Sequence, residues 1–252
     1  MLVDVQYPPG SGQQTDDQWL ACQDTNGLAY KVASANKAWI KENFSNGNKF
    51  KSGETELVFD SDAVLDLSTN EIKSKSPPGL MKKEVNNGNG NNGNGNGSNK
   101  RQLAVTTGEK SILVVRVVAA NASPTATESR LGDSVFGTLG DPVTLKSQYS
   151  KCSHGGLTIL PADNRDGMDG ANAVLIRNGT VTVTVSSSTT DGDGIMVNDV
   201  TAKLQSMFGT SASSLANHVM YCLPPGTMSG IAYAYINSWS SVYSDLWCTY
   251  LR

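Results

Sequence analysis

Ile112-Leu113-Val114-Val115-Arg116-Val117-Val118, continued by Ala119 and Ala120, is the stretch that decides the fold of this chain. It is an almost unbroken apolar run, rich in β-branched residues and without alternating polar positions. Such a run is typical of a strand that is buried on both faces. A strand of this kind needs a covering layer on each side. The sequence therefore predicts an α+β protein with a mixed, twisted β-sheet and covering helices.

Three segments after this strand supply the expected helices. A modest helical pattern covers 127–136, and a second helix is expected over 142–149, with Asp141 as N-cap and Pro142 at its first position. The clearest apolar stripe covers 195–208, and the glycine that follows it is a typical C-cap. We expect this third helix to pack across the sheet.

Further strands are expected on both sides of these helices. Residues 157–160 and 174–185 have strand character, the latter around an Asn178-Gly179 turn. Near the end of the chain, the apolar run 218–223 is stopped by Pro224-Pro225-Gly226, and 231–239 alternates small and aromatic residues. The alternation is typical of a strand with one buried face.

The N-terminal part of the chain predicts a smaller, β-rich unit. Short strands are expected at 27–32, 55–59 and 63–67, with one short helix over 34–44 for which Ser34 is a candidate N-cap. The unit is followed by fourteen residues, 86–99, that are only Asn, Gly and Ser. A stretch with nothing to bury does not offset the entropy of ordering. An inert low-complexity expansion and a protease-sensitive tether are both open interpretations.

These observations divide the 252 residues into a unit at 1–83, a disordered tether at 84–102 and a larger unit at 103–252. The net charge is −3, with 9 basic and 12 acidic residues up to Val85 and 11 of each from Lys100 onward. No basic stripe is interleaved with aromatic residues, so we expect no nucleic-acid partner. No apolar run approaches the ~20 residues that span a bilayer, so we expect no membrane partner.

Several of these segments resemble the gametolysin family, zinc metallopeptidases of algal cell-wall matrices within the metzincin group. In the larger unit the resemblance is carried by the runs at 112–118, 152–157, 218–226 and 231–248. In the N-terminal unit the segments Trp39-Ile40-Lys41-Glu42-Asn43-Phe44 and Ser52-Gly53-Glu54-Thr55-Glu56-Leu57 look like the propeptide that precedes the catalytic domain. The resemblance implies a propeptide with a chaperoning or inhibitory role, followed by the N-terminal part of a zincin-like, metzincin-type peptidase domain.

The zinc-binding motif of that family, His-Glu-x-x-His, does not occur in these 252 residues. The motif places two imidazoles one helical turn apart to hold zinc and sets a glutamate beside the metal-bound water. The two histidines here, His154 and His218, are 64 positions apart, and we expect both to be structural. We therefore expect no catalytic, cofactor-binding or zinc-binding residue in this chain, although zinc belongs to the full-length family.

Other metal and nucleophile patterns are weaker. The acidic stretches 163–170 and 191–194 carry oxygen ligands of the kind that calcium prefers, but Asp- and Gly-rich segments are usually turns. Cys22 could act as a zinc-directed thiolate in a propeptide, yet a disulfide or an inert thiol fits its surroundings better. Cys152 with His154 forms a Cys-x-His pair, although that cysteine looks more like a disulfide partner.

The compartment is predicted from conflicting signals. The sequence begins without a secretory signal. Against this stand an even number of cysteines and four Asn-x-Ser/Thr triplets, at Asn43, Asn96, Asn121 and Asn178. We expect a piece of an extracellular or cell-wall matrix protein, with the pairing of Cys22, Cys152, Cys222 and Cys248 left open.

Taken together, the sequence predicts a truncated gametolysin-like zinc metalloendopeptidase that is inactive as this chain. Its full-length relative would cleave extracellular or cell-wall matrix proteins. The alternative is a non-catalytic extracellular matrix or cell-surface binding protein that retains the sheet.

Overall fold

The computed structural model describes residues 2–6, 18–23, 28–35, 37–45, 55–82, 107–235 and 238–250. Over these residues the chain is a mixed α+β protein with four α-helices and three β-sheets, which confirms the α+β class. The helices are α1 (Lys37–Ser45), α2 (Glu128–Phe136), α3 (Leu145–Cys152) and α4 (Asp193–Phe208). The strands are β1 (Leu2–Gln6), β2 (Gln18–Gln23), β3 (Ala29–Val32), β4 (Thr55–Val58), β5 (Val64–Asp66), β6 (Glu71–Lys73), β7 (Gly79–Lys82), β8 (Gly108–Val118), β9 (Leu157–Pro161), β10 (Arg165–Asp169), β11 (Asn172–Ile176), β12 (Thr180–Thr184), β13 (His218–Leu223), β14 (Ala232–Tyr235) and β15 (Ser240–Ser244).

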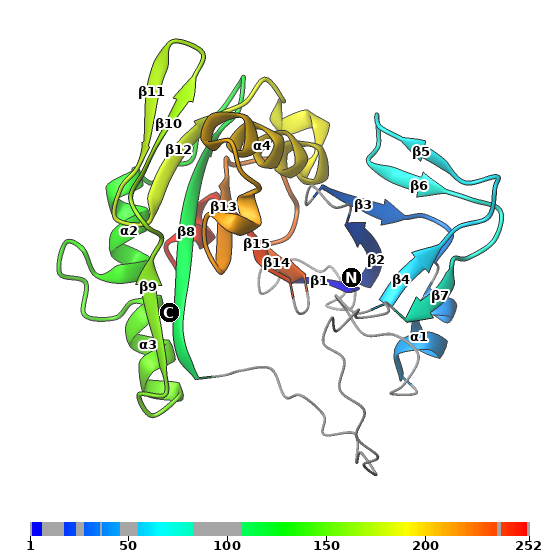
Figure 1. Cartoon of the computed structure of the whole chain (residues 1–252), viewed down its shortest axis with the longest axis horizontal. Coiled ribbons are helices and arrows are strands. Elements are labelled where there is room, and N and C mark those ends of the chain that lie inside the picture. The colour runs from blue at the N-terminus through cyan, green and yellow to red at the C-terminus, as the bar shows by residue number, and fades with distance from the viewer. Residues whose placement is uncertain are drawn as a thin grey trace, which may run out of the picture.

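One large sheet organises the described residues, in the order β12-β8-β13-β15-β14-β1-β2-β3-β6-β5 (Figure 1). Strands β12, β8, β13 and β15 run parallel to one another, whereas β14 is antiparallel to β15. Strand β9 pairs in parallel with the first half of β8, on the edge that β12 occupies further along. The sheet is therefore mixed, as the sequence predicts.

Strand β8 lies between β12 and β13 in this sheet and is buried on both faces. Leu113, Val115 and Val117 belong to one core cluster, and Ile112 and Val114 belong to the other. Successive side chains of a strand point to opposite faces, so an unbroken apolar run feeds two cores at once. Each fully buried side chain of this size contributes about 1.5–3 kcal/mol relative to exposure. The prediction of a doubly buried strand is confirmed.

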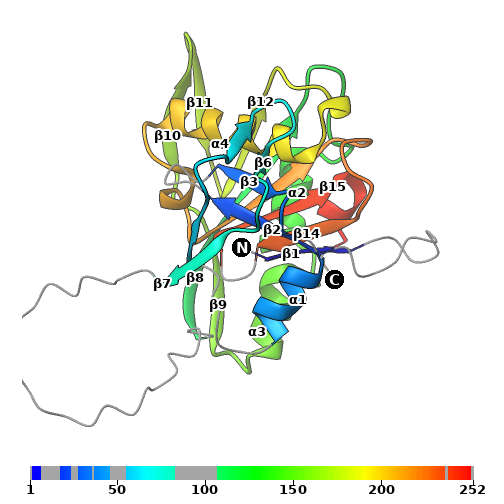
Figure 2. The same ribbon diagram turned by 90° about the vertical axis from the view of Figure 1, so that its right-hand side faces the viewer.

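Helices cover both faces of this part of the sheet. Helix α4 contributes Met196, Val200 and Leu204 to the same cluster as Leu113. Helix α2 places Leu131 and Val135 on the opposite face, and α3 packs beside it. Figure 2 shows α4 and α3 on different sides of the strands, in the view turned from Figure 1. The arrangement is three layers, with the parallel strands in the middle.

The N-terminal elements continue the same sheet. Strand β1 pairs on one edge with β14 and on the other with β2. In β2, Leu20 points into a small core with Val32 and Ile40, whereas its neighbour Ala21 points into the cluster under α4. A separate two-stranded sheet in this region pairs β4 with β7. The predicted tether, 84–102, lies outside the described residues.

Two predicted helix caps are wrong. Helix α3 has Thr144, not Asp141, as its N-cap, in a capping box with Ser147. Asp141 accepts the N–H of Val143 at 3.0 Å, so its carboxylate serves the preceding turn instead of the helix. Helix α1 begins at Lys37, and the hydroxyl of Ser34 accepts a hydrogen bond from Ser74 at 3.0 Å.

The C-cap of α4 and the turn before β12 were predicted correctly. Gly209 ends α4 in the left-handed conformation, with φ of 66°. Asn178 and Gly179 both have positive φ and form the tight turn before β12. These positions were predictable because each one depends on a short-range pattern.

The C-terminal strands were predicted in part. Strand β13 has the predicted bounds, and β14 occupies the start of the alternating stretch. A third strand, β15, was missed although it pairs in parallel with β13. After it a 3-10 turn, Asp245–Cys248, brings Cys248 into a disulfide with Cys222.

Candidate functional site

The chemically most versatile cluster lies on the face of β13 and β15 that packs toward α2 and α3. His218 and Cys222 alternate along β13 on this face, and Ser241 and Tyr243 do so along β15. The Nε2 atom of His218 lies 2.9 Å from the Oγ atom of Ser241, and the hydroxyls of Ser241 and Tyr243 are hydrogen-bonded to each other. Two adjacent parallel strands therefore align an imidazole, an aliphatic hydroxyl and a phenol.

A serine beside an imidazole is the arrangement that activates a nucleophile. Here Ser241 is 2% exposed, so a substrate does not reach its hydroxyl. Burial lowers the pKa of His218 to about 4, and burial also raises the pKa of Tyr243. At neutral pH the three groups are uncharged, and Ser241 is the hydrogen-bond partner of the other two, which is a structural role. The expectation that the imidazole of His218 is satisfied within the fold is confirmed.

The second histidine lies far from this cluster in an exposed turn. His154 follows α3 with a φ of 52°, between Ser153 and Gly155. Cys152, two residues earlier, is an exposed free thiol, so the preference for a disulfide at Cys152 is wrong. The disulfide in the described part of the chain instead joins Cys222 and Cys248, which the topology brings together from β13 and the turn after β15.

Cys22 lies in β2 and is partly buried, packed against the small core of Leu20, Val32 and Ile40. Within the residues that the structure describes, no three His, Cys, Asp or Glu side chains gather as a metal-ion site. None of the described helices has the length and apolar character to cross a bilayer.

The first acidic stretch forms a hairpin instead of a ligand loop. Residues Arg165–Asp169 are strand β10, paired antiparallel with β11. Asp166 accepts a hydrogen bond from Arg177 at 2.6 Å, and Asp169 is ion-paired with Lys203 of α4. Both carboxylates are thus engaged by cationic side chains, which weakens the calcium interpretation.

The second acidic stretch caps and begins α4. Asp191 accepts the backbone N–H of Ser188 at 2.7 Å and closes a short 3-10 turn. Asp193 starts the helix, where burial raises its pKa although the Tyr233 hydroxyl hydrogen-bonds to it. These two aspartates act on the backbone and on β14, and each has a structural partner.

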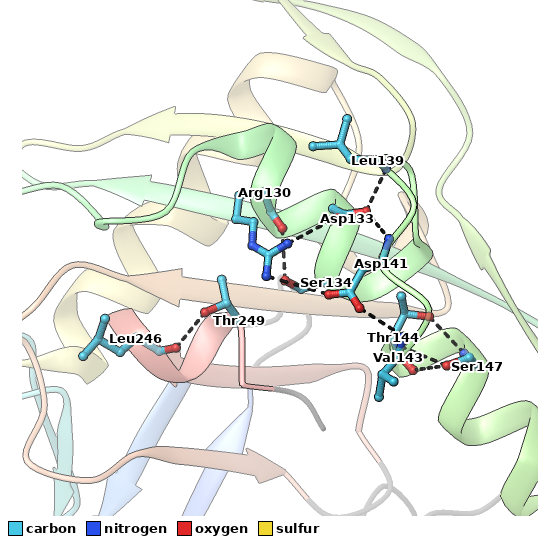
Figure 3. Close-up of polar contacts among 10 residues, drawn as sticks. All are labelled: Arg130, Asp133, Ser134, Leu139, Asp141, Val143, Thr144, Ser147, Leu246 and Thr249. Carbon is cyan, nitrogen blue, oxygen red and sulfur yellow. Dashed lines mark hydrogen bonds and ion pairs between the residues drawn. The ribbon is translucent and has the colours of Figure 1, made fainter.

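A polar network that the sequence analysis missed fixes the connection between α2 and α3 (Figure 3). Asp133, 3% exposed, accepts the N–H groups of Leu139 and Asp141 and pairs with Arg130 at 2.9 Å. Burial alone would raise the pKa of Asp133, but these donors outweigh it and hold the pKa below its ordinary value. An Asp inside an amphipathic helix gave no signal, since its partners are set by the loop that follows.

Two surface hollows lie on either side of strand β12. One, of about 310 Å³, lies between α2 and the turn before β12, with Glu128, Arg177 and Thr180 in its lining. Glu128 accepts hydrogen bonds from Thr180 and Thr182, at 2.9 and 2.6 Å. The other, of about 380 Å³, lies between β12 and α4. The charged groups of the first hollow are already paired within the protein, so it offers shape and polarity rather than a free reactive group.

The Asn-x-Ser/Thr triplets lie in different settings. Asn43 donates its amide to the Trp39 carbonyl, and Asn121 exchanges hydrogen bonds with Thr189. Asn178 is exposed at its turn, and Asn96 lies outside the described residues.

Comparison with protein-family models, with curated proteins and with solved structures found no match to this chain.

Proposed function

We propose that this chain supplies the propeptide-like unit and the N-terminal sheet scaffold of a gametolysin-like zinc metalloendopeptidase. The observation that carries the proposal is the mixed sheet around β8, in which the segments that resemble the family, 112–118 and 218–226, form adjacent parallel strands or end beside them. The zincin-type fold, the extracellular or cell-wall location and the matrix-protein substrate are parts of the same proposal. The Cys222–Cys248 disulfide supports the oxidising compartment.

In this proposal the chain does not hydrolyse peptides by itself. His-Glu-x-x-His is absent from its sequence, and its one strand histidine is a partly buried, neutral hydrogen-bond partner of Ser241. Peptide-bond cleavage would require a zinc-bound water that these residues do not hold. The sheet and helices would position the zinc-binding segment of a longer form.

The test measures zinc content and proteolysis on the purified chain. After dialysis against zinc and then against buffer, we expect substoichiometric metal and no chelator-sensitive cleavage of a protein substrate. Sequencing the transcript beyond codon 252 should then show an in-frame His-Glu-x-x-His. If that motif is missing from every longer form, the alternative of a non-catalytic matrix-binding protein replaces the enzyme proposal.

A further inference from the structure

We propose that residues 2–82 are a non-covalently held partner of residues 107–250. In this inference a cut between the two segments gives a two-chain protein instead of a released N-terminal piece. The binding surface is the edge of β14 that does not pair with β15, together with the side of α4, and its occupant is the N-terminal segment of this same chain. The inference does not depend on zinc or on peptidase activity.

The first contact is a shared strand. β1 pairs antiparallel with β14 over four residues, Val3 to Gln6 opposite Tyr235 to Ala232. On its other edge β1 pairs with β2. Figure 1 shows β1 between these two strands. Main-chain pairing along an edge is a general way to bind an extended segment, and it needs no covalent connection.

The second contact is a side-chain amide that forms hydrogen bonds with both backbone groups of a strand residue. The side chain of Asn198, on α4, accepts the N–H of Ala29 at 3.0 Å and donates to the carbonyl of Ala29 at 2.9 Å. Asn198 is 9% exposed and sits 169 positions from its partner. An asparagine amide has one acceptor and one donor side, so it satisfies both backbone groups of a single strand residue. Without β3, this buried amide would lose both of these partners.

The third contact is apolar. Ala21 of β2 is 2% exposed and belongs to the cluster under α4, with Tyr233 of β14 also in that cluster. The neighbouring Leu20 is fully buried on the other face, in the small N-terminal core. Strand β2 is therefore packed on both sides, and separating the two segments would expose apolar and polar groups together.

The experiment uses the full chain with a recognition site for a sequence-specific protease placed within 86–99. After complete cleavage under native conditions, size-exclusion chromatography with mass detection should show both fragments at the mass of the uncut protein. Protection of the Ala29 amide in hydrogen exchange should persist in the cleaved protein. Separation of the parent fragments, or loss of that protection on cleavage, would overturn the proposal.

Two variants locate the interaction. Asn198→Asp keeps an acceptor for the Ala29 N–H but replaces the donor with a charged oxygen facing the Ala29 carbonyl. We expect the N-terminal fragment of this variant to dissociate at least about tenfold faster after cleavage. Asn172→Asp makes the same chemical change at an exposed position of β11 and should dissociate like the parent. Equal dissociation rates in the two variants would show that the Asn198 amide does not hold the N-terminal fragment. The zinc and cleavage assays of the proposed function are read independently of either outcome.

Discussion

Among single residues, His218 connects the stability of the fold to pH. Burial lowers its pKa from the ordinary 6.5 to about 4. Between these values the unfolded chain binds a proton at this imidazole that the folded chain does not. The stabilisation is therefore complete above pH 6.5 and is lost as the pH falls toward 4. The loss amounts to at most about 3.5 kcal/mol, since each pKa unit corresponds to about 1.4 kcal/mol.

We expect His218→Gln to flatten this dependence, because glutamine retains a hydrogen-bonding group near Ser241 and does not titrate. Urea denaturation at a series of pH values through this window measures the free energy of unfolding. His154→Gln, at an exposed position, is the control for replacing a histidine by glutamine. If His218→Gln has the same dependence of the unfolding free energy on pH as the parent, other groups cause that dependence.

The roles of polar residues were predictable only in outline. The sequence analysis predicted a structural role for His218, but its hydrogen-bond partner Ser241 comes from a strand that was not predicted. Asp133 shows the opposite case, because its acceptor role depends on a loop conformation six to eight residues away. Burial and partner identity of such polar groups follow from tertiary packing, which no short pattern encodes.

At the scale of elements, the N-cap of α3 gives a direct test of a corrected prediction. The Thr144 side chain accepts the N–H of Ser147 at 3.1 Å, and the Ser147 hydroxyl accepts the N–H of Thr144 at 2.9 Å. Thr144→Ala should lower the free energy of unfolding by about 1–2 kcal/mol, because a buried cap is lost. Lys151→Ala, exposed on the same helix, should change it by less than ~0.5 kcal/mol. Thermal denaturation compares the stability of the two variants. An unchanged stability of Thr144→Ala would contradict Thr144 as the N-cap and favour Asp141.

Strands differ in how far their own sequence specifies them. The unbroken apolar run of β8 and the stripe of α4 were sufficient for prediction, since each element's burial is written in its own residues. Strand β1 was missed, because its partner β14 lies far along the chain. Strands β2 and β15 were missed as well, although each pairs with a strand close in sequence, β3 and β14. The stretch that contains β10 was expected to be a turn, with calcium binding as the weaker interpretation, since its Asp and Gly residues favour turns and only pairing with β11 makes it a strand.

For the whole molecule, the large sheet joins segments that the sequence separates by an Asn- and Gly-rich run. Composition predicted a tether at 84–102, which lies outside the described residues, and carried no information on strand pairing across that run. The pairing of β1 with β14 and the contact of β3 with α4 are long-range. Loop closure through a long connection costs only slightly more with added length, so an extended insert is compatible with one shared sheet.

The Cys222–Cys248 disulfide is the covalent restraint whose loss should be felt by the whole fold. It closes a loop of 26 residues that contains β14 and β15. A loop of that length corresponds to roughly 3–4 kcal/mol of stabilisation through the unfolded chain. Cys222→Ala/Cys248→Ala should therefore lower the free energy of unfolding by about that amount in urea titration. Cys152→Ala, at an exposed free thiol, should be silent. Adding a reductant should destabilise the parent and leave the double variant unchanged; an equal response of both proteins would contradict a structural role for this bond.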